Sequence, residues 1–220
     1  MKFAFPVLCA AGFALAACQQ PPSLPDADTL GPVNASAMTF FLTSVGPGDG
    51  ANLGGLSGAD AHCTSLATAA GSTGKTWAAY LSTNGADNVN AKDRIGAGPW
   101  VNARGVTVAT SVANLVDAEA NALSKANSIS ETGAFINGRG DSPNRHDILT
   151  GSNKDGTASD DTCTNWTGNG DGSATVGHHD RTGGGHSPTH WSTAHGSRGC
   201  SQANLRSSGG DGLFYCFAVN

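Results

Sequence analysis

The sequence predicts an α+β domain with antiparallel strands, one helix near its N-terminus and long glycine-rich loops. Regular apolar patterns occur near the two ends of the domain, whereas its middle consists mostly of Gly, Asn, Asp and Ser. The chain has 220 residues, of which 31 are glycine and 6 are cysteine. This composition favours a loop-rich fold that disulfide bonds stabilise.

Three segments have the composition of β-strands. Residues 39–45 are aromatic and β-branched, and residues 76–82 alternate so that Trp77, Ala79 and Leu81 share one side. Residues 213–219 form a third, largely apolar run that contains Cys216. Aromatic and β-branched residues with a period of two are typical of strands.

A helix is expected between the first two strands. Ser57 is the expected N-cap, with Asp60 three residues later, and Gly71 ends the helix. One apolar face recurs at helical spacing and comprises Ala59, Cys63, Leu66, Ala67 and Ala70. Cys63 should therefore point into the core.

The first 17 residues have the layout of a signal peptide. Lys2 precedes an apolar run that is too short to span a bilayer and ends on Leu-Ala-Ala-Cys, which is similar to a bacterial lipoprotein signal. In such signals the cysteine, here Cys18, carries the lipid. The open alternative is an ordinary signal peptide that leaves Cys18 as a free thiol. We expect an exported protein, lipid-anchored to the membrane, and at the outer membrane or cell surface if the cell is Gram-negative.

The expected organisation has three parts. Residues 1–17 are the signal peptide, and residues 18–37 are the lipidated cysteine followed by a Pro-rich tether. Residues 38–220 have the length of a single domain.

Four cysteines remain after the leader and the lipidation site: Cys63, Cys163, Cys200 and Cys216. An even number in an oxidising compartment favours two disulfides, with three connectivities open. No Cys-x-x-Cys pair supports a cysteine-based zinc site.

The charge content argues against polyanion partners. Charged residues make up 13% of the chain and the formal net charge is −5. The arginines are scattered rather than clustered, so we expect no nucleic-acid binding and weak, salt-sensitive heparin binding.

The order of these landmarks resembles a known family. Residues 58–63 (GADAHC) and 76–82 (TWAAYLS), then 148–152 (ILTGS) and 163–166 (CTNW), and last the segment around Cys216, follow the order of the endostatin domain, a collagen-derived module. Bacterial exported proteins with endostatin-like domains are similar as well. The resemblance covers nearly all of residues 38–220 and implies a C-type lectin-like fold. It also implies the pairings Cys63–Cys216 and Cys163–Cys200.

Calcium-dependent sugar binding is not implied, because the residues it needs are absent. The only comparable tripeptide is Ser142-Pro143-Asn144, and neither Trp166 nor Trp191 is followed by Asn-Asp. A calcium site needs several converging oxygen ligands. The Asp residues of the middle region are expected to cap their own turns.

Histidines cluster between Cys163 and Cys200, where five of the seven occur. Imidazole is a common zinc ligand, and mammalian endostatin binds zinc, although mainly through its N-terminal end. The best candidate ligands for a divalent metal such as zinc are His178, His179 and Asp180. The alternative is that these histidines only hydrogen-bond neighbouring loops.

The most consistent function is a membrane-anchored exported binding module. Its partner would be a surface glycan or an extracellular protein, recognised through the loop region between Asp141 and Arg206. Candidate contact residues are Asp141, Asn144, Trp166 and Trp191. Residues 139–141 also spell Arg-Gly-Asp, a three-residue match that is common by chance.

Catalysis has little support in the sequence. The chain has only two glutamates and neither a Gly-x-Ser-x-Gly nor a His-Glu-x-x-His motif. We therefore expect a protein that is not an enzyme. The alternative function is a metal-dependent or serine hydrolase with a His-rich site, because triad members need not be adjacent in sequence.

Overall fold

The computed structural model describes residues 31–220. The expected signal peptide, Cys18 and the first part of the tether lie outside the described residues. In chain order the elements are β1 (Phe40–Leu42), α1 (Gly55–Ala69), β2 (Trp77–Ala79), the 3-10 turns η2 (Gly85–Asp87) and η3 (Ala91–Asp93), β3 (Trp100–Val101), β4 (Thr107–Ala109), α2 (Val112–Val116), β5 (Asp147–Leu149), α3 (Cys163–Trp166), β6 (Thr175–His178), β7 (His195–Gly196), α4 (Gln202–Ser208) and β8 (Gly210–Ala218). The fold is α+β, as the sequence predicts, but the main sheet is mixed rather than wholly antiparallel, because β5 and β8 pair in parallel.

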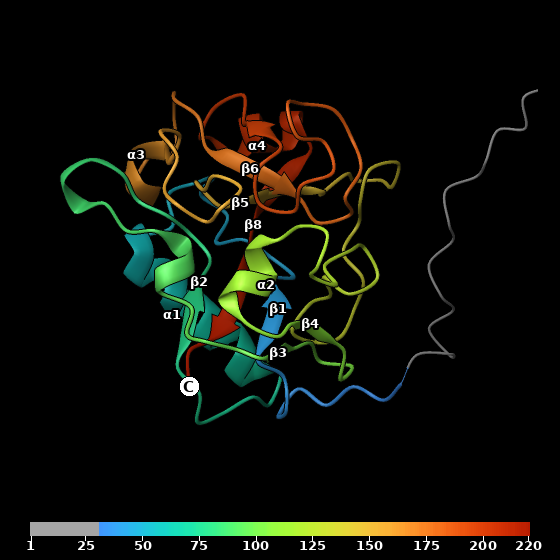
Figure 1. The fold of residues 1–220 in the computed structure, drawn as a ribbon. Helices are drawn as coiled ribbons and strands as arrows, with labels where there is room; N and C mark the ends of the chain where they lie inside the picture. The colour runs from blue at the N-terminus through green and yellow to red at the C-terminus, as the bar shows by residue number, and fades with distance from the viewer. Residues whose placement is uncertain (1–30) are drawn as a thin grey trace, which may run out of the picture.

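Strand β8 is the centre of the main sheet. The strand order is β1-β8-β5-β6-β7, with β2 also paired to β8, and β3 and β4 form a separate pair. β8 is antiparallel to β1 and β2 but parallel to β5. In Figure 1, β8 runs between α1 and β1–β4 on one side and β5, β6 and α4 on the other.

Alternation along β8 divides the core into two clusters. Phe214 and Cys216 pack into one cluster with α1, whereas Tyr215 and Phe217 pack into the other with Trp100. Side chains in a strand point alternately to the two faces of the sheet, so an apolar run of this length fills both. The two-sided burial explains why residues 213–219 are almost entirely apolar.

Helix α1 confirms the expected buried face but begins earlier than the sequence suggests. Ala59, Cys63 and Ala67 are its buried residues, and the N-cap is Gly54 rather than Ser57. Gly54 has a φ of 75°, which glycine adopts without strain. The Asp60 carboxylate does not cap the helix.

Instead, Asp60 links α1 to β2. Its Oδ1 accepts a hydrogen bond of 2.8 Å from the backbone N–H of Ala79, and its Oδ2 lies 2.7 Å from Nη2 of Arg94. These contacts of Asp60 hold α1 against β2.

Both disulfides have the pairing that the resemblance implies. Cys63 is bonded to Cys216 and Cys163 to Cys200. The first joins α1 to the last strand across a separation of 153 residues. In the chain-entropy model a loop of that length contributes about 5 kcal/mol of stability.

The expected tether ends on the domain surface. The backbone N–H of Asn34 donates to the carbonyl of Ala103, and Nη1 of Arg104 donates to the carbonyl of Gly31. Residues 31–37 therefore contact the domain. Within residues 31–220, the helices are all too short or too polar to cross a membrane.

Candidate functional site

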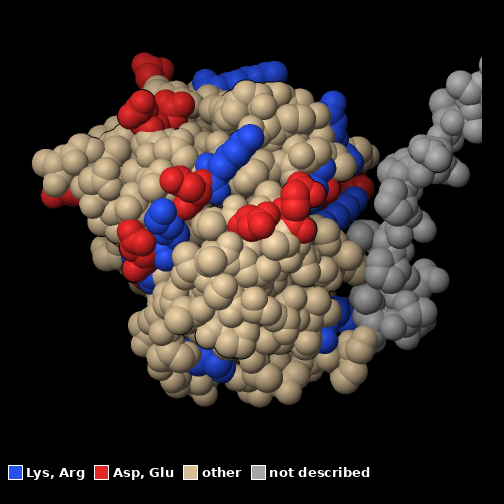
Figure 2. Space-filling view, viewed as in Figure 1, with Lys and Arg blue, Asp and Glu red and all other residues tan. Residues whose placement is uncertain are grey.

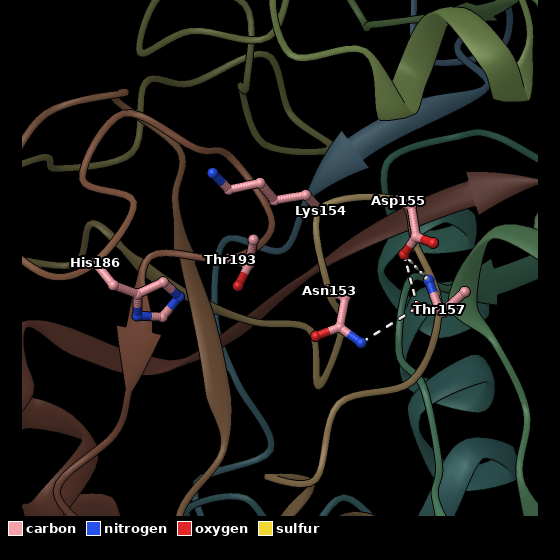
Figure 3. A pocket seen from close by; sticks show the side chains of 6 residues that line it. All are labelled: Asn153, Lys154, Asp155, Thr157, His186 and Thr193. Carbon is pink, nitrogen blue, oxygen red and sulfur yellow. Dashed lines mark hydrogen bonds between the residues drawn. The ribbon is translucent and has the colours of Figure 1, made fainter.

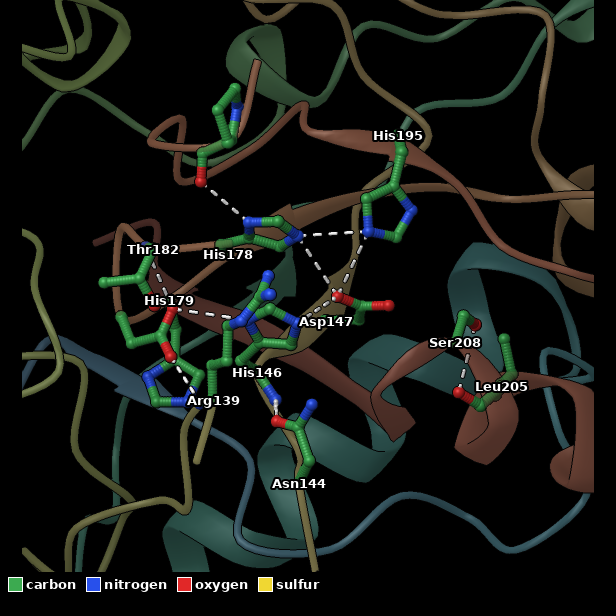
Figure 4. Close-up of polar contacts among 12 residues, drawn as sticks. Arg139, Asn144, His146, Asp147, His178, His179, Thr182, His195, Leu205 and Ser208 are labelled. Atoms are coloured by element: carbon green, nitrogen blue, oxygen red, sulfur yellow. Dashed lines mark hydrogen bonds and ion pairs between the residues drawn. The ribbon is translucent and has the colours of Figure 1, made fainter. Parts of the chain in front are cut away.

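Three imidazole rings converge on one carboxylate oxygen at the end of the main sheet (Figure 4). Asp147 Oδ1 lies 3.1 Å from Nε2 of His146, 3.3 Å from Nε2 of His178 and 3.5 Å from Nε2 of His195. Nε2 of His178 also lies 3.1 Å from Nε2 of His195. We call these four residues the His–Asp cluster.

Strand pairing positions the His–Asp cluster. Asp147 begins β5 and is the register partner of His178, the last residue of β6. His195 begins β7 and pairs with Val176 of β6. Directly paired residues have neighbouring side chains, so three consecutive strands bring these groups together.

Asp147 is buried, and its carboxylate lacks hydrogen bonds. The residue is 2% exposed, and neither Oδ1 nor Oδ2 receives a hydrogen bond of acceptable geometry. Burial alone would raise the pKa of the Asp147 carboxyl, but contacts with His178 and His195 outweigh burial and lower it. The carboxylate is therefore ionised at neutral pH. The same contact with Asp147 raises the pKa of His195.

Each ring of the cluster has a hydrogen-bond acceptor at its other nitrogen. Nδ1 of His178 lies 2.7 Å from the carbonyl oxygen of Pro188, and Nδ1 of His195 lies 3.0 Å from that of Gly196. Nδ1 of His146 lies 3.4 Å from Oδ1 of Asp180. A ring that donates to its acceptor from Nδ1 presents the lone pair of Nε2 to Asp147.

Glycines cover the rings. A Cβ at Gly183 would lie 2.8 Å from Cε1 of His178 and 3.0 Å from Cε1 of His146, and one at Gly185 would lie 3.0 Å from Cδ2 of His195. The two rings of His146 and His178 are stacked, with centroids 4.1 Å apart. The run of glycines at 183–185 thus allows the loop to pass directly over the cluster.

The structure separates the three expected metal ligands. Only His178 belongs to the His–Asp cluster. Nε2 of His179 lies 3.1 Å from the carbonyl oxygen of Asn137, and burial lowers the pKa of His179 to about 4. His179 follows the last residue of β6, and its ring contacts Asn137 rather than the members of the His–Asp cluster.

Asp180 supports the cluster from outside. Its Oδ1 contacts Nδ1 of His146, and its Oδ2 accepts from the backbone N–H of Arg139. Burial raises the pKa of the Asp180 carboxyl, but these hydrogen bonds outweigh it and the pKa is lowered.

The expected contact residues do not form one surface. Trp166 and Trp191 are each fully buried, so neither ring offers a face for stacking on a ligand. Asp141 lies 2.6 Å from Nζ of Lys125, and Oδ1 of Asn144 accepts from the backbone N–H of His146. The carboxylate of the Arg-Gly-Asp segment is therefore already engaged in an ion pair with Lys125.

A polar pocket lies between two loops of the Asp141–Arg206 region (Figure 3). Its volume is about 470 Å³. The lining residues are Asn153, Lys154, Asp155, Thr157, His186 and Thr193.

Some of these polar groups are already satisfied within their loop. Asp155 Oδ1 accepts from the backbone N–H and the hydroxyl of Thr157, and Nδ2 of Asn153 donates to the Thr157 hydroxyl. The hydrogen bonds from Thr157 lower the pKa of the Asp155 carboxyl. Within residues 31–220, the side chains of Lys154, His186 and Thr193 form no hydrogen bond or ion pair.

One serine–histidine pair bears on the hydrolase alternative. Ser192 Oγ lies 3.3 Å from Nδ1 of His190, but Ser192 is fully buried. Nδ1 of His190 also accepts from the backbone N–H groups of Ser192 and Thr193. This pair closes a turn, and the serine hydroxyl is shielded from solvent.

Charges on the visible face are mixed rather than grouped. In Figure 2, Lys and Arg side chains lie among Asp and Glu side chains. A broad polyanion-binding surface would require an excess of one sign.

No known protein family has a model that matches this chain, and no curated protein is significantly similar to it. The fold and the site therefore rest on the residues of this chain alone.

Sequence reasoning missed three members of the cluster. His146 and Asp147 precede Cys163, outside the His-rich segment, and His195 was counted there without a role. No local pattern linked these residues to His178, because pairing of β5, β6 and β7 brings them together.

Proposed function

We propose that this protein is an exported, membrane-anchored binding module that recognises a surface glycan through the polar pocket of residues 153–157, 186 and 193. The anchor is Cys18, and the C-type lectin-like relationship is part of the proposal. Supporting it are the α+β fold, the two disulfides and the order of sequence landmarks.

The single observation that carries the glycan assignment is the set of unpaired polar groups in the pocket. Lys154 and Thr193 offer donors, and His186 offers a donor or an acceptor. The pocket is an open depression with a volume of about 470 Å³, so a bound ligand would remain partly in contact with solvent.

A hydroxyl-rich sugar fits this lining better than an apolar ligand. The six lining residues are all polar or charged, and both hydrogen-bond donors and acceptors are present. Each sugar hydroxyl can donate and accept, so it can pair with either kind of group. The loop Asn153–Thr157 is held by its own hydrogen bonds, which reduces the entropy cost of binding.

A glycan array with three proteins tests the proposal. Thr193→Val removes one hydroxyl at nearly constant volume, and Thr189→Val is the matched control on an exposed threonine outside the pocket. We expect the wild type and Thr189→Val to bind the same glycans, and Thr193→Val to bind about 10-fold more weakly. If Thr193→Val bound the glycans as tightly as Thr189→Val does, the glycan would have to bind outside the pocket.

The anchor is tested separately. Wild-type protein should partition into detergent, and Cys18→Ala should not. A Cys18→Ala protein that stays in the membrane fraction would remove the anchor from the proposal without affecting the pocket.

An extracellular protein is the other partner class. If an array of matrix proteins gives binding that Thr193→Val and Lys154→Met leave unchanged, recognition uses a surface other than the pocket.

A further inference from the structure

We propose that the His–Asp cluster binds one divalent transition-metal ion, with zinc as the preferred metal. The ligands are Nε2 of His146, Nε2 of His178, Nε2 of His195 and Oδ1 of Asp147. This proposal does not depend on the glycan pocket. Its ligands differ from the set His178, His179 and Asp180 that the sequence suggested.

Three of the donor residues, His146, Asp147 and His178, already lie close enough together to hold a metal ion, and His195 adjoins two of them and would have to approach His146 to complete a tetrahedron. Four donor–donor separations are 3.1, 3.3, 3.5 and 3.1 Å. Zinc lies about 2.0–2.1 Å from its nitrogen and oxygen ligands, so neighbouring corners of its tetrahedron are about 3.3 Å apart. The ligand atoms of His146, Asp147 and His178 all lie within 4.8 Å of one another.

The outer hydrogen-bond partners of the rings are compatible with a cation. If the ring protons lie on Nδ1, toward Pro188, Gly196 and Asp180, each Nε2 directs its lone pair toward Asp147. A cation between these atoms and the Asp147 carboxylate would then serve as their common partner.

The stacking of two rings brings their ligand atoms to the same side of Asp147. His146 and His178 are stacked with centroids 4.1 Å apart, and Nε2 of each faces Oδ1 of Asp147. One metal ion placed between these groups would serve them from a single centre.

The outer contacts are those typical of metal sites. A ligating histidine commonly donates its other N–H to a carboxylate or a carbonyl, which fixes the ring and its tautomer. Asp180 has this role for His146, and the carbonyl of Pro188 has it for His178. The carboxylate of Asp147 accepts no hydrogen bond, as expected for an atom whose partner is a metal.

The donor set selects the metal and its role. Three imidazoles and one carboxylate suit zinc, whereas calcium and magnesium prefer oxygen ligands. Four protein ligands complete a tetrahedron and leave no position for a substrate, so we assign a structural role. The metal would connect β5, β6 and β7, which hold the loops of the binding region.

Titration of the full chain, freed of metal by a chelator, with zinc chloride tests the site. We expect one zinc per chain, a higher unfolding temperature with zinc, and with cobalt the intense visible absorption of a tetrahedral ion. His195→Ala should weaken zinc binding by at least about 100-fold, and Asp180→Asn by about 10-fold. His186→Ala is the control and should bind as the wild type does.

His195 is the most informative ligand to change, because its side chain is 25% exposed and its loss leaves little buried space. Near-UV circular dichroism shows whether the variant is folded. If a folded His195→Ala binds zinc as the wild type does, or if the wild type shows no saturable binding, the proposal is wrong. A weak cobalt spectrum of octahedral type would contradict the ligand set.

Discussion

Asp147 and His178 face each other as register partners of β5 and β6, and their side chains meet with Oδ1 3.3 Å from Nε2. The contact depends on strand pairing rather than on nearness in sequence. Because the two strands are antiparallel, the end of β6 lies beside the start of β5, where His146 also lies. Any change that moves β6 should therefore disturb the whole cluster.

Gly177 is the residue that lets β6 approach the loop before β7. A Cβ at this position would lie 1.9 Å from the carbonyl oxygen of Trp191. We expect Gly177→Ala to destabilise the fold by about 3 kcal/mol, because the backbone must shift to accommodate the methyl group. Denaturant unfolding measures the loss.

Gly184→Ala provides the control for this change. A Cβ at Gly184 would meet no atom within 4 Å, and its backbone is not in the left-handed region. Its stability should change by less than about 0.5 kcal/mol. Equal effects of the two substitutions would show that β6 is not packed as described.

Thr164 lies in a left-handed turn that costs backbone energy. Residues 163–166 all have positive φ, and Thr164 has φ 56° and ψ 49°. This conformation costs an L-residue about 1–2 kcal/mol, and glycine avoids most of that cost. After allowing for the greater unfolded-state entropy of glycine, we expect Thr164→Gly to raise stability by about 0.5 kcal/mol.

A glycine substitution at an exposed threonine outside the left-handed region tests whether the turn is the cause. Thr189 is exposed and is not among the residues with positive φ. Thr189→Gly should lower stability, so a gain at both positions would argue against relief of strain. Thermal unfolding of the two variants gives the comparison.

His190 should make the loop beside the pocket sensitive to acid. Burial, followed by the charges of Lys154 and Arg181, lowers the pKa of His190 from 6.5 to about 4. Its Nδ1 accepts hydrogen bonds from the backbone N–H groups of Ser192 and Thr193, which a proton on Nδ1 would break. The folded state thus favours the neutral ring.

Because the pKa of His190 is lowered in the folded state, acid should destabilise the fold. The unfolded chain binds a proton at a higher pH than the folded chain, so stability from His190 is complete above pH 6.5 and is lost as the pH falls toward about 4. His190→Asn keeps an acceptor near Nδ1 but does not titrate. In metal-free protein its stability should fall less than that of the wild type over this range. Parallel stability curves would contradict the role of His190.

Elements with a strong local pattern could be predicted from the sequence. The apolar run of residues 213–219 predicted β8, because a strand that is buried on both faces is apolar throughout. The helical spacing around Cys63 predicted α1, because a helix that is buried on one side has apolar residues on that side. The first turn of α1 was misplaced, because Gly54 starts the helix without a side-chain cap. The resemblance supplied the cysteine pairing, which local pattern left open.

The candidate metal site could be predicted only in part. His178 was included because histidines cluster near it, whereas Asp147 and His195 join it through strand pairing between short strands. Strands of two to four residues have too little pattern to reveal their partners. Trp166 and Trp191 were expected to contact a ligand, but their rings are buried in the core.

The most direct test of the metal centre is a crystal structure of the zinc-loaded protein, with diffraction data collected on both sides of the zinc absorption edge. We expect one anomalous peak bonded to Oδ1 of Asp147 and to Nε2 of His146, His178 and His195, at about 2.0–2.2 Å from each. A peak at other residues, or no peak between these four side chains, would contradict the account.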